Sequence, residues 1–147
     1  MRKLTLLMPL VLLTMTAAEC GSNRTNSPRP VHCEVLIDGP KKADDREIIV
    51  GMVRFNCDKP GAEPLKLTLK LDKKSGDKWH TASSKSFTVR GSDTNAGAFR
   101  HQSRTVEVRC ASGVFRTVVE WSRESRGDTE SDTETSGVVK DPCGKRP

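Results

Sequence analysis

The chain has 147 residues, of which 34% are hydrophobic and 30% charged, and its formal net charge is +6. If a secretory signal that contains Arg2 and Lys3 is removed, the net charge of the remaining chain falls to about +4. Such a mildly basic composition argues against specific binding of nucleic acid, and the remaining length is sufficient for one domain.

Residues 1–18 are predicted to be a signal peptide. A basic pair precedes an apolar run at residues 4–15, and small residues suitable for cleavage follow this run. The run is too short to span a bilayer comfortably and contains Pro9, so no transmembrane segment is expected. We therefore expect a secreted, extracellular protein, with a flexible polar linker at residues 19–30.

Cys20 is the odd cysteine of five. A cysteine just after an export signal favours a lipoprotein, in which the thiol carries a lipid anchor on the outer face of the membrane. The residue before it, however, is Glu19, where a small residue is expected. Simple secretion is therefore the preferred interpretation, and lipidation at Cys20 is the alternative.

Residues 31–143 are predicted to form one β-domain, followed by a tail at 144–147. Apolar and polar residues alternate at residues 31–38, before Gly39-Pro40, and an apolar stretch at 47–57 has the character of a central strand. Four leucines alternate with polar residues at 65–72. A polar turn at 73–78 should connect this strand to a partner at 79–89 in a hairpin. Lys85 lies on the apolar side of that partner, which predicts a bulge or a sheet edge there.

The second half of the domain shows weaker patterns. Residues 91–102 form a polar loop, long enough to cross between two sheets. Alternating strands at 104–110 and 115–121 flank a short Ala-Ser-Gly turn and are predicted to form a second hairpin. Residues 123–137 are rich in acidic and hydroxyl side chains and are expected to be a mobile loop before a short last strand at 138–139.

Seven short strands without a sustained helical period predict an all-β fold, an antiparallel immunoglobulin-like β-sandwich. The chain contains no tyrosine, and its cysteines do not fall on the second and sixth strands as they do in antibody domains. The sandwich should therefore have disulfides of its own.

Four cysteines are expected to form two disulfides in an oxidising space. If successive strands alternate in direction, Cys33 and Cys57 meet at one end of the sandwich and Cys110 and Cys143 at the other. A reversal at the 91–102 crossover would instead bring all four to one end and allow the other two pairings.

Several short motifs occur together between Cys33 and Cys143: Cys57-Asp58-Lys59-Pro60, Leu-x-Leu-x-Leu, Gly76-Asp77-Lys78-Trp79, Val108-Arg109-Cys110-Ala111-Ser112-Gly113 and Asp141-Pro142-Cys143. This combination resembles a group of small secreted actinobacterial β-domain proteins without an assigned role. The resemblance implies an exported Gram-positive β-domain and supplies no catalytic residues.

Candidate catalytic and metal-binding groups are few. The three histidines, His32, His80 and His101, lack the spacing of a zinc site, and no serine lies in a Gly-x-Ser-x-Gly turn. We therefore predict no catalytic residue, no metal and no cofactor, and the protein is expected not to be an enzyme.

The leucine hairpin is locally basic and is the candidate site for a polyanion. Its candidate residues are Lys66, Lys70, Lys73, Lys74 and Lys78. They could contact an anionic cell-wall polymer, or simply protect a sheet edge from pairing. The leading hypothesis is a non-enzymatic protein that acts by surface contact at or outside the cell envelope, with such a polymer or another extracellular protein as partner. The alternative is a small secreted enzyme inhibitor or hydrolase accessory protein that engages an active site through the 91–102 loop.

Overall fold

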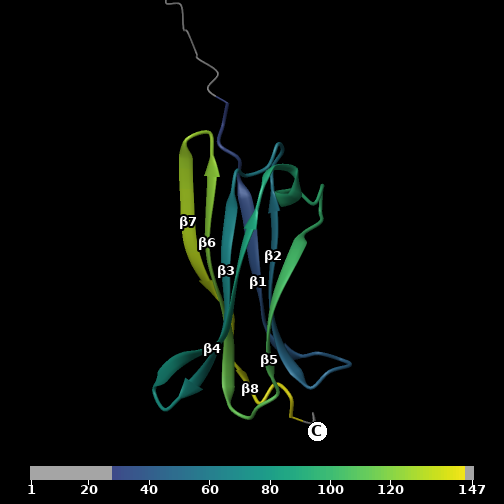
Figure 1. Ribbon diagram of the computed structural model, residues 1–147, viewed down its shortest axis with the longest axis vertical. Helices are drawn as coiled ribbons and strands as arrows, with labels where there is room; N and C mark the ends of the chain where they lie inside the picture. The colour runs from purple at the N-terminus through teal and green to yellow at the C-terminus, as the bar shows by residue number, and fades with distance from the viewer. Residues whose placement is uncertain (1–27, 145–147) are drawn as a thin grey trace, which may run out of the picture.

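The computed structural model describes residues 28–144 (Figure 1). The predicted signal peptide, most of the linker, Cys20 and the last three residues lie outside this range. The elements are eight strands and one short 3-10 helix: β1 (Cys33–Lys42), β2 (Ile48–Cys57), β3 (Leu65–Ser75), β4 (Lys78–Val89), η1 (Gly91–Thr94), β5 (Gln102–Arg109), β6 (Val114–Ser125), β7 (Asp128–Thr135) and β8 (Val139–Lys140). Within residues 28–144, no helix is both long and apolar enough to cross a bilayer.

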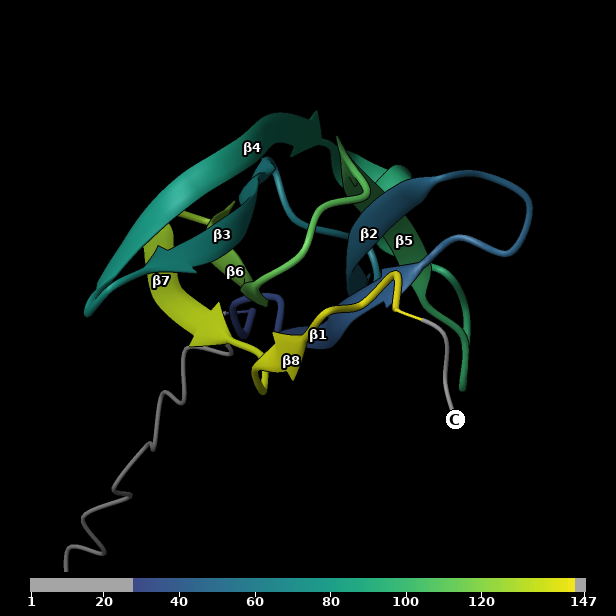
Figure 2. The same cartoon turned by 90° about the horizontal axis from the view of Figure 1, so that it is seen from below.

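The strands form two antiparallel sheets that pack face to face (Figures 1 and 2). One sheet has the order β1-β2-β5, and the other has the order β4-β3-β6-β7, with β8 also paired to β6. The chain crosses between the sheets after β4, through η1 and the loop to β5, as predicted. The fold is an immunoglobulin-like sandwich in which the fourth strand pairs with the third, whereas in constant-type domains it joins the sheet of the first, second and fifth.

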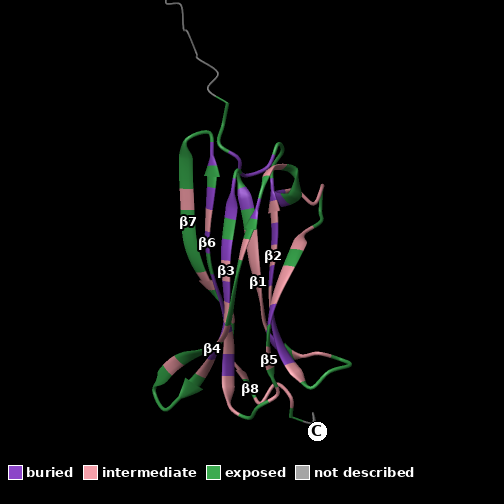
Figure 3. Ribbon diagram, viewed as in Figure 1, coloured by how far each residue is buried: buried purple, intermediate pink, exposed green. Residues whose placement is uncertain are grey.

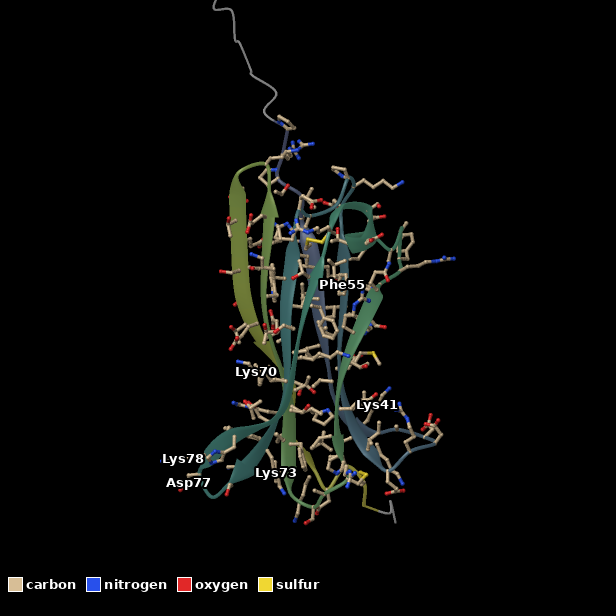
Figure 4. The ribbon with its side chains drawn as sticks, viewed as in Figure 1. Lys41, Phe55, Lys70, Lys73, Asp77 and Lys78 are labelled. Atoms are coloured by element: carbon tan, nitrogen blue, oxygen red, sulfur yellow. A yellow bond between two sulfur atoms is a disulfide. The ribbon has the colours of Figure 1, made fainter. Side chains whose placement is uncertain are left out.

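The leucine strand β3 lies at the centre of the core. Its four alternating leucines, Leu65, Leu67, Leu69 and Leu71, are at most 1% exposed. They pack with residues of β2 that include Phe55, which lies between the sheets in Figure 4. Buried positions run along β2, β3 and β6 (Figure 3). Each leucine contributes roughly 1.5–3 kcal/mol through burial, so the period-two pattern of this strand contributes strongly to the stability of the fold.

The two sheets approach one another closely at Gly51 in the middle of β2. A Cβ atom at this position would lie 2.9 Å from Cγ2 of Thr117 on β6 and 3.1 Å from Cδ2 of Leu71. Both distances are shorter than ordinary van der Waals contacts. Glycine is therefore required here by the spacing of the sheets.

Two disulfides close the ends of the sandwich with the predicted pairing, Cys33–Cys57 and Cys110–Cys143. Cys33 and Cys57 are directly opposite in the β1–β2 register, with Cα atoms 4.0 Å apart. The second disulfide attaches the segment after β8 to the end of β5. Figure 4 shows one sulfur pair at each end of the molecule.

Two predicted strand ends were wrong. β1 does not stop at Gly39-Pro40 but continues to Lys42, and an irregularity between Asp38 and Lys41 accommodates the proline. β3 continues to Ser75, so the turn consists of Gly76-Asp77 alone, with Gly76 at a positive φ of 59°. In both hairpins, backbone pairing extends beyond the last apolar residue. The predicted edge position of Lys85 is confirmed, because β4 ends its sheet, and the register also shifts nearby, at Ala82, between the partners of Leu71 and Asp72.

The predicted second hairpin was also wrong. β5 pairs with β2 and β6 pairs with β3, so the short connection at 110–113 joins the two sheets instead of two paired strands. Apolar and polar residues alternate in both strands because each strand turns one face toward the core, β5 from one sheet and β6 from the other. Local alternation cannot distinguish this corner from a hairpin.

Residues 123–137 do not form the expected mobile loop. β6 continues to Ser125, and β7 returns beside it as the edge strand. Arg123 points inward, its side chain only 7% exposed, and lies 2.9 Å from both Asp128 and Glu130. These two ion pairs explain how so polar a strand is held against the sheet.

Candidate interaction site

The structure separates the five lysines of the predicted polyanion site. Lys66 and Lys70 lie on the outer face of β3, next to carboxylates of β6. Lys66 Nζ is 3.6 Å from Glu124, and Lys70 forms an ion pair with Glu120. Much of the positive charge on this face is therefore neutralised within the molecule.

The other three lysines lie toward the free end of the hairpin (Figure 4). Lys73 is on the inner side, with Nζ 5.6 Å from the ring centroid of Phe115. Lys74 and Lys78 are exposed beside the Gly76-Asp77 turn. The five residues thus do not form one continuous surface, and only the pair at the tip remains available for a polyanion.

The three histidines come from different segments: His32 precedes β1, His80 lies on β4 and His101 precedes β5. His32 and His80 are exposed, and His101 Nε2 is 3.0 Å from a carboxylate oxygen of Glu34. In the part of the chain that the structure describes, no three residues of the metal-binding types come together.

A second surface feature is the loop at residues 95–101, between η1 and β5. Two asparagine side chains hold it against the end of β2. The amide of Asn56 donates to the carbonyl oxygen of Gly97 at 3.2 Å and accepts from Ala96 N–H at 2.8 Å. Asn95 donates to the carbonyl oxygen of Cys57 at 2.6 Å. The side chains of Asn56 and Asn95 form four hydrogen bonds that hold the loop to the end of β2 and stabilise its own turn. The loop therefore has a fixed shape.

The base of this loop is equally well fixed. Thr94 is fully buried, and its hydroxyl accepts from Ala62 N–H at 2.9 Å and donates to the carbonyl oxygen of Gly91 at 2.7 Å. Gly61, at a φ of 103°, lies so close that a Cβ atom would be 1.9 Å from Gly91 O. The turn after β2 and the helix η1 therefore form one rigid support.

Phe99 lies at the apex of this loop. Arg100 N–H donates to the carbonyl oxygen of Gly97 at 3.3 Å, which makes Phe99 the third residue of a tight turn. Its φ is 60°, in the left-handed region that costs a bulky residue about 1–2 kcal/mol. Its side chain is 103% exposed. Figure 1 shows the loop projecting beside η1, away from both sheets.

An aromatic side chain at this position gains nothing from burial, and it makes the left-handed backbone conformation of the turn more costly. Glycine or asparagine is the usual residue at such a turn position. The sequence indicated the loop as a contact segment for an active site, but it did not identify Phe99. The Ala-Gly-Ala context could have indicated a turn, whereas full exposure of the ring could not be predicted.

No protein-family model matches this chain, and no curated protein matches it. The candidate site is therefore defined by geometry alone.

Proposed function

We propose that this chain is a secreted, non-enzymatic β-sandwich that binds another extracellular protein, and that Phe99 is the anchor of the contact. The observation that carries this proposal is the fully exposed ring on a left-handed residue in a rigid loop. Backbone strain of this kind concentrates at functional sites. Two disulfides and the N-terminal signal pattern support an oxidising, extracellular location.

The chemistry of the loop defines the kind of partner surface. Buried aromatic anchors dominate many protein interfaces, and a loop that is already rigid loses little conformational entropy on binding. The partner should offer an apolar pocket for Phe99 with an acidic rim for the exposed neighbour Arg100. The positive φ at Phe99 turns the backbone, whereas a peptide that binds as an added strand is extended. This geometry favours an anchor over a substrate-like inhibitory segment.

Photo-crosslinking tests the proposal. Benzoylphenylalanine at position 99 should give a cross-linked product with an extracellular protein, and the same group at Val138, which is 62% exposed, should not. Excess unlabelled wild-type chain should suppress the product, whereas excess Phe99→Gly chain should not. Equal products from both positions, or equal suppression by both competitors, would refute a role for Phe99.

Contact with an anionic cell-wall polymer is the second candidate function. It is favoured by Lys74 and Lys78, which are exposed and are not in the ion pairs found within residues 28–144. Reversing both charges should abolish sedimentation with anionic polymer, and Lys66→Glu, beside Glu124, is the matched control on the sheet face. Binding that is unchanged by the tip variant would exclude this candidate.

A further inference from the structure

The five-stranded sheet has two long free edges. Within residues 28–144, β4 pairs with β3 alone and β7 pairs with β6 alone. Seen along its length, the molecule has these two strands on different sides (Figure 2). On β7, Thr133 N–H donates to the carboxylate of its neighbour Asp132 at 2.7 Å. Free edges of this kind are templates for pairing with a further strand.

The two edges carry opposite charge. β4 contains Lys78 and Lys85 and no carboxylate, whereas β7 contains four carboxylates and no basic residue. Arg123 forms ion pairs with Asp128 and Glu130 and compensates one of their two negative charges. Across residues 28–144, no ion pair is formed by Asp132, Glu134 or Lys85. Each edge thus retains charge that its own molecule does not compensate.

These uncompensated charges point to the inner side of the sheet on both strands. Lys85 lies opposite Leu69 in the register, with Nζ 5.4 Å from the ring centroid of Phe87. Asp132 and Glu134 lie opposite Trp121 and Val119. An inward-pointing charge prevents an edge from pairing with an identical edge, because like charges would be placed together. The same charges favour pairing between β4 and β7.

The groove beside β4 has room for an incoming strand. Two hollows of about 710 and 300 Å³ follow this edge, lined by residues 83–90 at the end of β4, by Asp93 of η1, and by Gln102 and residues 104–107 of β5. Arg104 is among the lining residues, with its guanidinium 5.5 Å from the ring centroid of Phe55. Inward-pointing carboxylates of a strand added to β4 would enter a groove that offers Lys85 and Arg104, together with Asp93 and with Glu107, which is itself paired with Arg46.

We propose that β7 of a second copy of this chain pairs with β4 and extends the sheet from one molecule to the next. Strand direction alternates across the sheet, so β7 of the second copy meets β4 in the antiparallel sense. If Asp132 is opposite Lys85, three of the outward-facing pairs are hydroxyl to hydroxyl: Ser84–Thr133, Ser86–Ser131 and Thr88–Thr129. Such cross-strand pairs are favourable.

The contact is head to tail, because it joins different surfaces of the two copies. Repetition therefore gives an open array or a ring, and not a closed two-fold dimer. Every added copy would present another Phe99 loop, which would increase binding through multivalency to a partner that is itself repeated. The assembly and the Phe99 contact use different residues, since the assembly uses the edge strands β4 and β7, whereas Phe99 lies in the crossover loop between the sheets.

Sedimentation of edge variants tests the assembly. The wild-type chain should show a mass that rises above the monomer with concentration at low salt, and about 0.5 M salt should weaken the association about tenfold. Lys85→Glu blocks the β4 edge, and the double variant Asp132→Lys with Glu134→Lys blocks the β7 edge. Each should be monomeric alone. Lys74→Glu, the same charge change away from the edge, should associate as the wild type does.

The mixture of the two blocked chains is decisive. Each retains one intact and complementary edge, so the mixture should form complexes of two chains and no larger species. Circular dichroism and intact disulfides in each variant show that the monomers are folded. A wild-type chain that remains monomeric at about 0.5 mM in low salt overturns the proposal. A mixture that stays monomeric, or that forms large aggregates, overturns it as well.

Discussion

Replacement of Phe99 by glycine should leave the fold intact or stabilise it. The side chain is fully exposed, so its removal exposes no apolar surface of the core. Glycine relieves the left-handed strain of about 1–2 kcal/mol, but it also increases the entropy of the unfolded chain, at a cost of about 0.4–1 kcal/mol. The free energy of unfolding should therefore change by between about zero and about +1.5 kcal/mol. Most other large-to-small aromatic substitutions in proteins are destabilising.

Urea unfolding followed by tryptophan fluorescence measures this change, with Trp121, which is 9% exposed, as the buried reporter. Phe55→Ala is the matched control: Phe55 is fully buried, and its truncation should cost about 3–5 kcal/mol. If Phe99→Gly lowers the free energy of unfolding by more than about 1 kcal/mol, the ring supports the fold and the argument for a binding role fails.

Three further substitutions test the description of the sandwich. Gly51→Ala should lower the free energy of unfolding by about 1–3 kcal/mol, because the new methyl group meets Thr117, and an unchanged melting temperature would show that the sheets can separate. Arg123→Ala should cost about 1–3 kcal/mol and accelerate amide exchange at residues 128–135; equal protection of β7 in this variant would contradict its anchoring by ion pairs. Replacement of both Cys110 and Cys143 by alanine should cost about 3.7 kcal/mol in guanidinium unfolding, the loop-closure value for their separation of 33 residues, and a loss below about 1 kcal/mol would contradict that account.

The core and the disulfides could be predicted from sequence because they depend on simple periodicity and strand direction. Leu65 to Leu71 alternate strictly, and this pattern is enough to define a half-buried strand. Alternating strand directions then place the cysteines in pairs at the two ends. Neither inference requires knowledge of which sheet a strand belongs to.

The strands that were missed or mispaired depend on contacts between distant segments. β7 has no apolar residue, so its pairing depends on backbone hydrogen bonds and on Arg123, a residue of the preceding strand. The corner at 110–113 has the local pattern of a hairpin. Its true role follows only from the pairing of β5 with β2.

The candidate site was predictable as a segment but not as a residue. The 91–102 crossover was expected from its length and polarity, but the exposure of Phe99 results from hydrogen bonds between Asn56 and residues forty positions later. Similarly, the lysines of the β3–β4 hairpin are close in sequence, but Lys66 and Lys70 lie on the outer face of β3 and Lys73 lies on its inner side. Lys66 and Lys70 are also paired with carboxylates of β6, which is about fifty residues away in the sequence, so these ion pairs could not be predicted from the local pattern.

The disulfides at the two ends of the sandwich also determine how the domain responds to mechanical force. Tension between residues 28 and 144 enters the fold at Cys33 and leaves at Cys143, so each disulfide bears the load directly and shields the segment that it encloses. Only the chain between Cys57 and Cys110 can then be drawn out, to at most about 3.5 Å per residue. Reduction would release the segments of 24 and 33 residues behind the two bonds, so the length that the unfolded domain can reach is controlled by the redox state of its surroundings.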